Sequence, residues 1–159
     1  MAARIGLGFD LHKLVGGTGF RLGGVEVPAD VRPEGHSDAD PLLHALVDAL
    51  LGAAARGDIG EHFPDTDDRW KDADSRLFVE KAKQFVAEAG LTIGNVDATV
   101  FLEKPKLGRL KDDMRRVIAG LLDVDVKNVS IKAKTLEGLG SIGTSQAVAA
   151  QVGVILHEP

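Results

Sequence analysis

Residues 4–12 alternate strictly between two kinds of side chain. The first set is apolar and consists of Ile5, Leu7, Phe9 and Leu11. The second set is glycine or polar and consists of Gly6, Gly8, Asp10 and His12. Because successive residues of a strand point to opposite faces, this alternation predicts a half-buried β-strand. The chain is therefore expected to form a sheet.

Hairpin and helix patterns follow this segment. Short apolar pieces at residues 20–22 and 25–27 lie among several glycines and predict a β-hairpin. Asp40 is a suitable N-cap and Pro41 suits the first helical position, so we expect a helix from here to about Ala55. The apolar residues of this helix form one stripe, made of Leu42, Leu43, Leu46, Val47 and Leu50. His44 and Asp48, four positions apart, project together from the other side.

The second half of the chain alternates between helix and strand. Helical spacing covers residues 77–89 and 107–122, and strand patterns cover residues 92–103 and 128–135. The last apolar segment, residues 145–156, fits a strand or a helix, and its valine and isoleucine residues favour a strand. A strand, a helix and a strand within about 45 residues make a βαβ or split βαβ unit. We predict an α/β (α+β) fold: one domain over residues 1–159, with a mixed β-sheet and helices packed on one face.

The composition limits the chemistry. The chain has 159 residues and no cysteine, so a metal ion must be bound by histidine and carboxylate groups, and no thiol can act as a nucleophile. Its 19 basic and 24 acidic residues give a net charge of −5, which argues against nucleic acid as a partner. No apolar run approaches the roughly 20 residues of a membrane span, and no signal peptide precedes the first strand. We expect a cytoplasmic protein without a membrane partner.

Two polar residues of the first strand are candidate metal ligands. Asp10 and His12 are two positions apart, so their side chains leave the same face and can bind one ion. His44 is the best candidate for a third ligand, because it lies in the first turn of a helix, where the N-terminus favours a neutral imidazole. Three protein ligands leave one position open, as in a catalytic zinc site. The alternative is an acid and a histidine at the mouth of a strand beside an unrelated surface histidine.

Other fragments are open to more than one interpretation. Residues 138–143 match the three-glycine dinucleotide pattern, but too little chain follows them to complete a Rossmann unit, so we expect a turn near a ligand. Glu137 either binds a hard cation or is an ordinary solvated glutamate. Ser37, His36 and Asp40 could form a hydrolase triad only without the usual Gly-x-Ser-x-Gly turn.

Basic residues gather at two places. Lys104, Lys106, Arg109 and Lys111 lie where a predicted strand meets a helix, and Lys132 and Lys134 share one face of another strand. In an acidic protein such clusters can bind phosphate, although solvated lysines are the alternative explanation.

Ordered motifs connect the chain to a known family. They include Gly8-Phe9-Asp10-Leu11-His12, His36-Ser37-Asp38-Ala39-Asp40, Gly57-Asp58-Ile59-Gly60, Phe63-Pro64-Asp65-Thr66-Asp67, Ala73-Asp74-Ser75-Arg76, Lys104-Pro105-Lys106 and Lys132-Ala133-Lys134-Thr135-Leu136-Glu137. In this order, over residues 4–157, the chain resembles the 2-C-methyl-D-erythritol 2,4-cyclodiphosphate synthases of the non-mevalonate isoprenoid pathway.

The resemblance implies a phosphorus-oxygen lyase that acts on 4-diphosphocytidyl-2-C-methyl-D-erythritol 2-phosphate. In this reaction the 2-phosphate attacks the β-phosphorus, CMP leaves, and a cyclic diphosphate forms. Members of the family are homotrimers with active sites between adjacent subunits. The resemblance therefore implies a homotrimer with a cytidine diphosphate substrate.

The resemblance also implies roles for individual residues. The family's zinc ligands match Asp10, His12 and His44, and its second divalent cation, Mg²⁺ or Mn²⁺, matches Glu137. His36 and Thr135 match positions that stabilise the transition state. The family's substrate-binding positions include five of the residues already named: Asp10, His12, His36, Thr135 and Glu137. The other substrate-binding positions match Ser37, Asp58, Ile59, Gly60, Phe63, Asp65, Asp67, Lys104, Pro105, Lys106 and Lys134.

The chain departs from the family pattern at two places, beside Thr135 and in the glycine-rich loop. Lys134 and Leu136 stand where relatives commonly carry small hydroxyl residues, and Thr144 stands where some carry arginine. No isoprenoid diphosphate site is therefore assigned in a central cavity. The competing functions are a zinc-dependent phosphohydrolase, in which water attacks, and a non-catalytic nucleotide-binding module, which predicts four protein ligands to a structural zinc.

Overall fold

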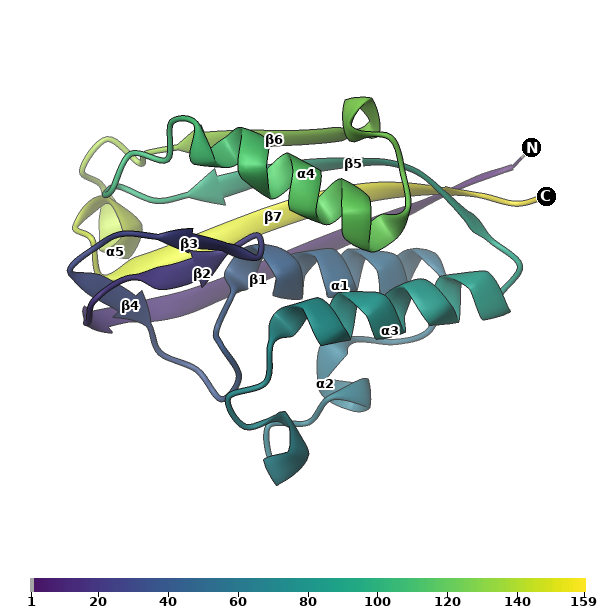
Figure 1. Ribbon diagram of the computed structural model, residues 1–159, viewed down its shortest axis with the longest axis horizontal. Coiled ribbons are helices and arrows are strands. Elements are labelled where there is room, and N and C mark those ends of the chain that lie inside the picture. The colour runs from purple at the N-terminus through teal and green to yellow at the C-terminus, as the bar shows by residue number, and fades with distance from the viewer. Residues whose placement is uncertain (1) are drawn as a thin grey trace.

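Five strands form one mixed sheet in the computed structural model of this protein, which describes residues 2–159. In sheet order they are β4 (Val31–Pro33), β1 (Ala3–Gly16), β7 (Ala147–His157), β5 (Thr92–Phe101) and β6 (Val129–Lys134). β7 runs antiparallel to both β1 and β5, whereas β5 and β6 are parallel, so the sheet is mixed as predicted (Figure 1). β2 (Phe20–Leu22) and β3 (Val25–Val27) form the expected separate hairpin.

Three long helices cover the sheet. α1 (Pro41–Ala53) packs on β1 and β7, α4 (Leu110–Leu122) packs on β6, and α3 (Ser75–Glu88) packs against α1. Figure 1 shows α4 lying across β5 and β6. Four short helical turns complete the chain: α2 (Ile59–His62), η1 (Asp68–Trp70), η2 (Val126–Asn128) and α5 (Gly140–Gly143). Within residues 2–159, no helix combines the length and the apolar character needed to cross a bilayer.

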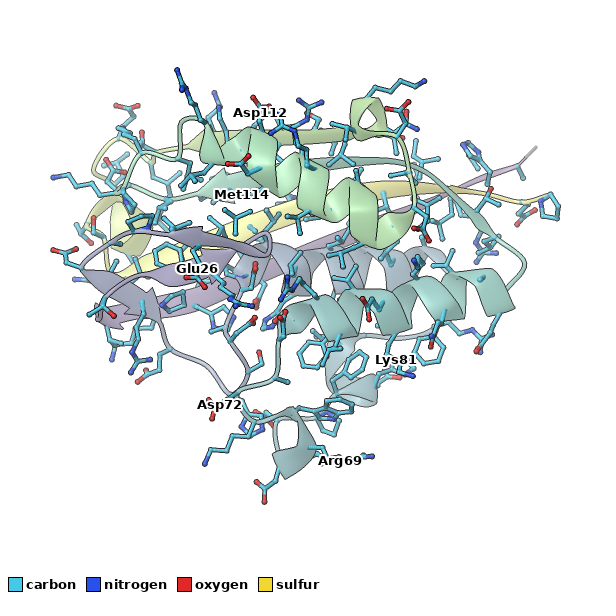
Figure 2. The ribbon with its side chains drawn as sticks, in the orientation of Figure 1. Glu26, Arg69, Asp72, Lys81, Asp112 and Met114 are labelled. Atoms are coloured by element: carbon cyan, nitrogen blue, oxygen red, sulfur yellow. The ribbon has the colours of Figure 1, made fainter. Side chains whose placement is uncertain are left out.

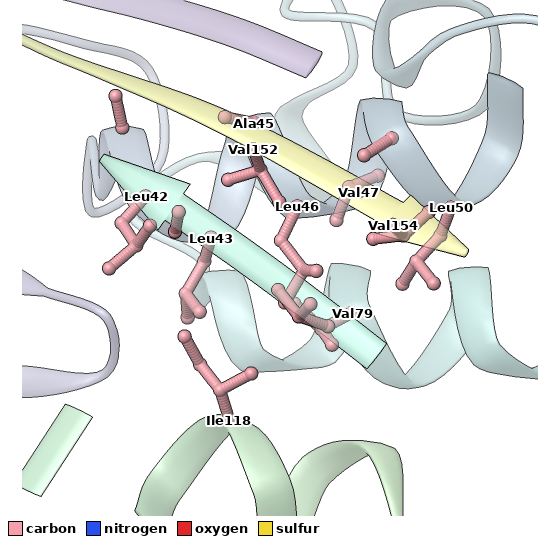
Figure 3. Packing of buried hydrophobic residues seen from close by; sticks show 14 of the residues in the cluster. Leu42, Leu43, Ala45, Leu46, Val47, Leu50, Val79, Ile118, Val152 and Val154 are labelled. Carbon is pink, nitrogen blue, oxygen red and sulfur yellow. The ribbon is translucent and has the colours of Figure 1, made fainter. Parts of the chain in front are cut away.

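The core lies between α1 and its neighbours. α1 is apolar around almost its whole circumference, so it is buried on several sides at once. Figure 3 shows Leu42, Leu43, Leu46 and Leu50 of α1 packed with side chains from α3, α4 and β7. Among the α1 residues only His44, Asp48 and Gly52 escape full burial, and His44 and Asp48 are the polar pair that the sequence pattern separates from the apolar stripe.

The two faces of β1 lie in different environments. The apolar face is open to solvent: Ile5 is 71%, Leu7 70%, Phe9 56% and Leu11 47% exposed. The glycine face lies against α1, because a Cβ on Gly6 would be only 1.8 Å from the carbonyl oxygen of Ala49. The strand is half-buried as predicted, yet its bulky side chains form the exposed half.

Element boundaries differ modestly from the sequence prediction. The helix expected to reach Ala55 ends at Ala53, and the helix expected from residue 107 begins at Leu110. The strand predicted over residues 92–103 ends at Phe101, and the final segment is a strand over residues 147–157. β4 and the four helical turns were not predicted, because three or four residues are too few to show a period.

Candidate metal centre and adjoining pocket

The structure brings Asp10, His12 and His44 together. His12 Nε2 lies 2.8 Å from Asp10 Oδ2, His44 Nδ1 lies 3.0 Å from the same oxygen, and the two nitrogens are 3.3 Å apart. In a tetrahedral zinc site with metal–ligand distances of 2.0–2.1 Å, neighbouring ligand atoms are separated by about 3.3 Å. The three atoms therefore fit a shared divalent cation. Among residues 2–159 this is the one such cluster of histidine and acidic side chains.

Packing of α1 on β1 creates the cluster. Asp10 and His12 lie on the glycine face of β1, and His44 lies in the first turn of the helix that covers that face. Asp40 caps this helix by accepting a hydrogen bond from the backbone N–H of Leu43, as predicted. The same carboxylate accepts hydrogen bonds from the N–H groups of Gly23 and Gly24 in the hairpin turn. The start of α1 is thus fixed to two other parts of the fold.

The protonation states of Asp10 and His12 depend on each other. Burial by itself would raise the pKa of Asp10, but hydrogen bonds to His12 and His44 outweigh burial and hold the pKa well below its ordinary value. Burial by itself would lower the pKa of His12, but the hydrogen bond to Asp10, the charge of Asp10 and the hydrogen bond to the Glu34 backbone together outweigh burial and raise the pKa. Asp10 is therefore ionised near neutral pH and available as a ligand. A metal ion at this position competes with a proton on the histidines.

Both imidazoles are fixed by their second nitrogens. His12 Nδ1 lies 2.8 Å from the carbonyl oxygen of Glu34, to which only a protonated nitrogen can donate. In the neutral imidazole, His12 Nε2 then has a lone pair that points into the cluster. His44 Nε2 faces the hydroxyl groups of Ser37 and Ser75, at 3.0 and 2.8 Å. Such outer partners commonly orient metal-ligating histidines.

A cavity of about 430 Å³ adjoins the cluster. His12, His36, Ser37 and His44 line one part of it, together with Gly35. The remaining wall is formed by Ile59, Gly60, Phe63, Pro64, Asp65, Trp70 and Phe78. A hydrogen bond from the Ile59 N–H to Asp48 Oδ1, 2.7 Å long, holds the α2 segment beside this cavity. The volume suits a small organic ligand.

Three aromatic rings build the apolar wall. Phe63 stacks on Phe78 with ring centroids 4.6 Å apart, and Trp70 meets both rings edge-on at 5.3 and 5.6 Å. Phe78 falls within the helical spacing of residues 77–89, and no sequence pattern predicted a role for Trp70. Helical spacing marks both buried and pocket-lining residues in the same way, so it could not separate them.

Asp58 and Asp67 are among the predicted substrate residues that do not line this cavity. Asp58 caps α2 by accepting a hydrogen bond from the Glu61 N–H, and it is exposed. The Asp67 side chain binds Arg69, which projects from η1 into solvent (Figure 2). The backbone carbonyl of Asp67 does reach the site, since it lies 3.2 Å from His36 Nε2.

A second group of predicted residues lies elsewhere in the chain. Pro105, Lys106, Lys134 and Thr135 line a small cavity of about 80 Å³ at the carboxyl ends of β5 and β6. Lys104 is next to Pro105, and exposed Glu137 accepts a hydrogen bond of 3.1 Å from the Thr135 hydroxyl. None of these residues lines the cavity beside His44. Within one chain, the candidate site residues therefore form two sets that line separate cavities.

A larger hollow of about 470 Å³ lies between α4 and β6. Arg109, Lys111, Arg115 and Lys127 line it, but it includes no histidine and none of the three clustered ligands. The Arg115 guanidinium is already engaged by the carbonyl oxygens of Val126 and Val129 and by Asp112. Size alone does not identify a reactive site, so the cavity beside the Asp-His-His cluster is the better candidate.

Sequence comparison agrees with this geometry. A sequence model of the YgbB family matches residues 3–157. The chain belongs to the YgbB family. It is 52% identical over 155 residues to the 2-C-methyl-D-erythritol 2,4-cyclodiphosphate synthase of Shouchella clausii, covering 98% of each protein. It is 55% identical over 154 residues to the synthase of the same name from Salinibacter ruber, covering 97% of this chain and 98% of that one.

Solved structures resemble this YgbB-family chain over nearly its whole length. The IspF of Plasmodium falciparum, solved as a CDP complex, superposes with a TM-score of 0.86 at 33% identity, covering 98% of this chain and 96% of that one. The bifunctional IspDF of Campylobacter jejuni superposes with a TM-score of 0.89 at 39% identity. The match covers 98% of this chain but 42% of the bifunctional one, so the resemblance there is to one part of a longer protein.

Proposed function

We propose that this YgbB-family protein is a lyase that converts 4-diphosphocytidyl-2-C-methyl-D-erythritol 2-phosphate to 2-C-methyl-D-erythritol 2,4-cyclodiphosphate and CMP. The observation that carries the proposal is the Asp10-His12-His44 cluster, which offers three ligand atoms and adjoins a cavity of about 430 Å³. Close relatives with 52% and 55% identity bear the name of this synthase. The whole chain, residues 1–159, acts as one catalytic domain.

Two cations are part of the proposal. Asp10, His12 and His44 would hold zinc, because an Asp-His-His set with an open position suits a catalytic zinc ion. Glu137 would hold Mg²⁺ or Mn²⁺, since a carboxylate is a preferred ligand for such hard cations. When bound, these cations supply positive charge that polarises phosphoryl oxygens and offsets the repulsion between two phosphate groups.

The substrate carries its own nucleophile. The second pKa of a phosphate monoester is about 6, so the 2-phosphate is already ionised near neutral pH and needs no strong general base. Its oxygen forms a bond to the β-phosphorus while the bond from that phosphorus to the bridging oxygen breaks, and CMP leaves with the electron pair. The protein's main task is then to hold these atoms in line and stabilise their charge.

Residues around the large cavity take the methylerythritol phosphate in this proposal. His36 and Ser37 line the cavity and offer polar hydrogens to phosphate oxygens. Phe63 belongs to the aromatic wall, which suits the carbon skeleton of the substrate and keeps water away. The remaining positions assigned to this part of the substrate are Asp58, Ile59, Gly60, Asp65 and Asp67.

The second set of residues takes the cytidine diphosphate part. Lys104, Pro105, Lys106 and Lys134 supply a lysine-rich surface for nucleotide and phosphate. Thr135 of this set stabilises the transition state together with His36 of the first set. The IspF of Plasmodium falciparum, solved as a CDP complex, supports a cytidine diphosphate ligand for this chain. In one chain this set lies apart from the metal cluster, so a complete site requires another copy.

We infer a homotrimer in which each site is shared by neighbouring chains. The open face of β1 exposes four bulky apolar side chains, Ile5, Leu7, Phe9 and Leu11, in a single row. A continuous apolar surface of this kind is typical of a subunit interface. Packing between copies would cover the row and can bring the Thr135–Glu137 segment of one chain to the metal cluster of the next.

Phosphorus NMR of the reaction products tests the proposal. The protein is incubated with the cytidyl substrate, zinc and magnesium, and the ³¹P spectrum is recorded as substrate disappears. We expect CMP and a cyclic diphosphate in equal amounts. An open-chain phosphate with a cytidine product would indicate attack by water and contradict the proposal, as would unchanged substrate with metal-loaded protein.

A further inference from the structure

Two residues outside the cavity fix the His44 imidazole through Nε2, the ring nitrogen that does not belong to the metal cluster. His44 Nε2 lies 2.8 Å from the hydroxyl oxygen of Ser75, the first residue of α3. The Ser75 hydroxyl also bonds to Asp38 Oδ1, and the Ser75 backbone N–H donates to Asp38 Oδ2 at 3.0 Å. Ser75 is 0% exposed. The arrangement is a chain of bonds from the Asp38 carboxylate through the buried Ser75 to His44.

The direction of the hydrogen bonds follows from the chemistry of the three groups. An ionised carboxylate only accepts hydrogen bonds, so the single hydroxyl proton of Ser75 is committed to Asp38. The Ser75 oxygen can then only accept from His44, which places a proton on His44 Nε2. His44 Nδ1 is left with its lone pair, and this is the nitrogen that faces Asp10 and His12.

From this chain of bonds we infer that Asp38 and Ser75 are positioning residues that set the tautomer and ring orientation of His44 for metal binding. Neither residue lines the cavity or belongs to the three-ligand cluster, and Ser75 contacts that cluster only through His44 Nε2. Their effect passes through the imidazole, as a carboxylate does when it orients a metal-bound histidine through its second nitrogen.

Ser37 cannot set the tautomer of His44 in the same way. Its hydroxyl oxygen is 3.0 Å from the same His44 Nε2, but it lines the cavity and its proton is not committed to a carboxylate in the structure. A hydroxyl with a free proton can donate to His44 or accept from it, so it fits either tautomer. Ser75 fits only the tautomer with the proton on His44 Nε2.

The Asp38–Ser75 link is itself rigidly placed. Asp38 lies in the loop that precedes α1, and its backbone N–H donates to the Ala73 carbonyl oxygen at 3.1 Å. Asp38 Oδ1 also lies 3.4 Å from the backbone N of Asp40, the N-cap of α1. The chain of bonds therefore joins the starts of α1 and α3 directly behind the candidate ligand.

Zinc affinity tests the inference, which rests on the proposed metal site. In Asp38→Asn the side-chain amide can donate to the Ser75 oxygen, so that Ser75 donates to His44 Nε2 and the proton moves to Nδ1, the ligand atom. We expect the zinc dissociation constant to rise about 10- to 100-fold, as for other outer-partner changes. Ser75→Ala, which removes the link, should give a loss of the same order. The measurement is competition between zinc-loaded full-length protein and a chromophoric chelator, with zinc alone as ligand.

Asp74→Ala is the matched control. Asp74 caps α3 next to Ser75 and binds Arg21 and Arg76, but it makes no bond to His44. Its loss should destabilise the same helix terminus and leave zinc affinity unchanged. A change below tenfold in both Asp38→Asn and Ser75→Ala, or an equal loss in Asp74→Ala, would overturn the inference.

A spectroscopic readout does not depend on any variant. In the zinc-loaded, unsubstituted protein, long-range ¹H–¹⁵N spectra should show His44 protonated at Nε2 and unprotonated at Nδ1. The opposite tautomer would overturn the inference even if the substituted proteins fail to fold. Neither test uses turnover, so a wrong assignment of the reaction would leave both results interpretable.

Discussion

Gly8 on β1 and Ala45 on α1 approach so closely that a Cβ on Gly8 would lie 1.9 Å from the Ala45 carbonyl oxygen. Helix and strand therefore meet without a side chain of Gly8 between them. His44 precedes Ala45, and Asp10 lies two residues after Gly8 on the same face of the strand. The close contact is what allows three ligand atoms from two elements to lie within hydrogen-bonding distance.

Gly8→Ala should damage both stability and the metal centre. The added methyl group cannot fit beside the helix backbone, so α1 must move away from β1. We expect a loss of about 3 kcal/mol in unfolding free energy, at the upper end of overpacking effects, together with weaker zinc binding. Denaturant unfolding and zinc titration measure the two effects.

Gly52→Ala on the same helix is the control for that change. A Cβ at Gly52 would have no atom within 4 Å. Alanine is favoured over glycine in a helix by up to about 1 kcal/mol, so this variant should be equally or more stable and keep its zinc affinity. Equal behaviour of the two variants would show that close approach at Gly8 does not position the site.

The sequence predicted the strand, the helix and the relation between them, but not which face of the strand is buried. Alternation shows that residues 4–12 have two faces, and bulk suggests that Ile5 and Leu7 belong inside. The structure reverses this, because the small residues admit a helix and the large ones are left for another surface. A pattern in one chain does not say whether an apolar face meets the core or a second copy.

The candidate metal ligands were predictable from the sequence, but the residues that support them were not. Asp10 and His12 follow from strand period, and His44 follows from its position off the apolar stripe. Ser75 is 31 residues from His44 in sequence and becomes its neighbour only through the packing of α3 on α1. Such a contact leaves no local signal in the spacing of residues.

Asp40→Asn should lower stability. Asp40 Oδ1 accepts from Gly23 and Leu43, and Oδ2 accepts from Gly24, in a fully buried position. An asparagine has one oxygen, so its amide nitrogen would face a backbone donor. We expect a loss of about 2 kcal/mol, measured by denaturant unfolding.

A substitution at the exposed N-cap of a short helical turn is the control for Asp40→Asn. Asp125 caps η2 by accepting from the Lys127 N–H and is exposed. Asp125→Asn should change stability by less than about 0.5 kcal/mol, because surface substitutions away from buried networks have small effects. Equal losses at the two positions would contradict the anchoring role given to Asp40.

The Asp74 ion pair should appear in the pH dependence of stability. A hydrogen bond from Arg76 lowers the pKa of Asp74 below its ordinary value of 3.8. A carboxyl group with a lowered folded-state pKa contributes stability above its unfolded pKa and loses it as pH falls through the folded pKa. The pair is partly exposed, so the contribution should be about 1 kcal/mol or less.

Unfolding free energies of the parent protein and Asp74→Asn, measured between pH 2.5 and pH 7, test this point. Asparagine keeps the N-cap and removes the charge. The stability difference should be constant above about pH 5 and shrink below about pH 4. A difference that stays constant down to the lowest pH would show that the ion pair contributes nothing.

A shared active site predicts complementation between two inactive variants. His44→Ala removes a metal ligand from one half-site and Glu137→Ala removes a carboxylate from the other, so each should be inactive alone. If the halves come from neighbouring chains, random mixing in a co-expressed trimer should leave about one quarter of the sites intact. Activity near that fraction, measured by CMP release, supports the shared site. Mixed assemblies without activity would place both halves in the same chain and contradict it.

Zinc content of His44→Ala, measured by inductively coupled plasma mass spectrometry, tests the three-ligand centre most directly. His62→Ala serves as the matched histidine control, because His62 bonds to the Arg56 carbonyl oxygen away from the cluster. We predict about one zinc ion per chain in the parent protein and in His62→Ala, and almost none in His44→Ala, with synthase activity lost in step. One tightly held zinc per chain in His44→Ala would contradict the ligand set on which the proposed reaction depends.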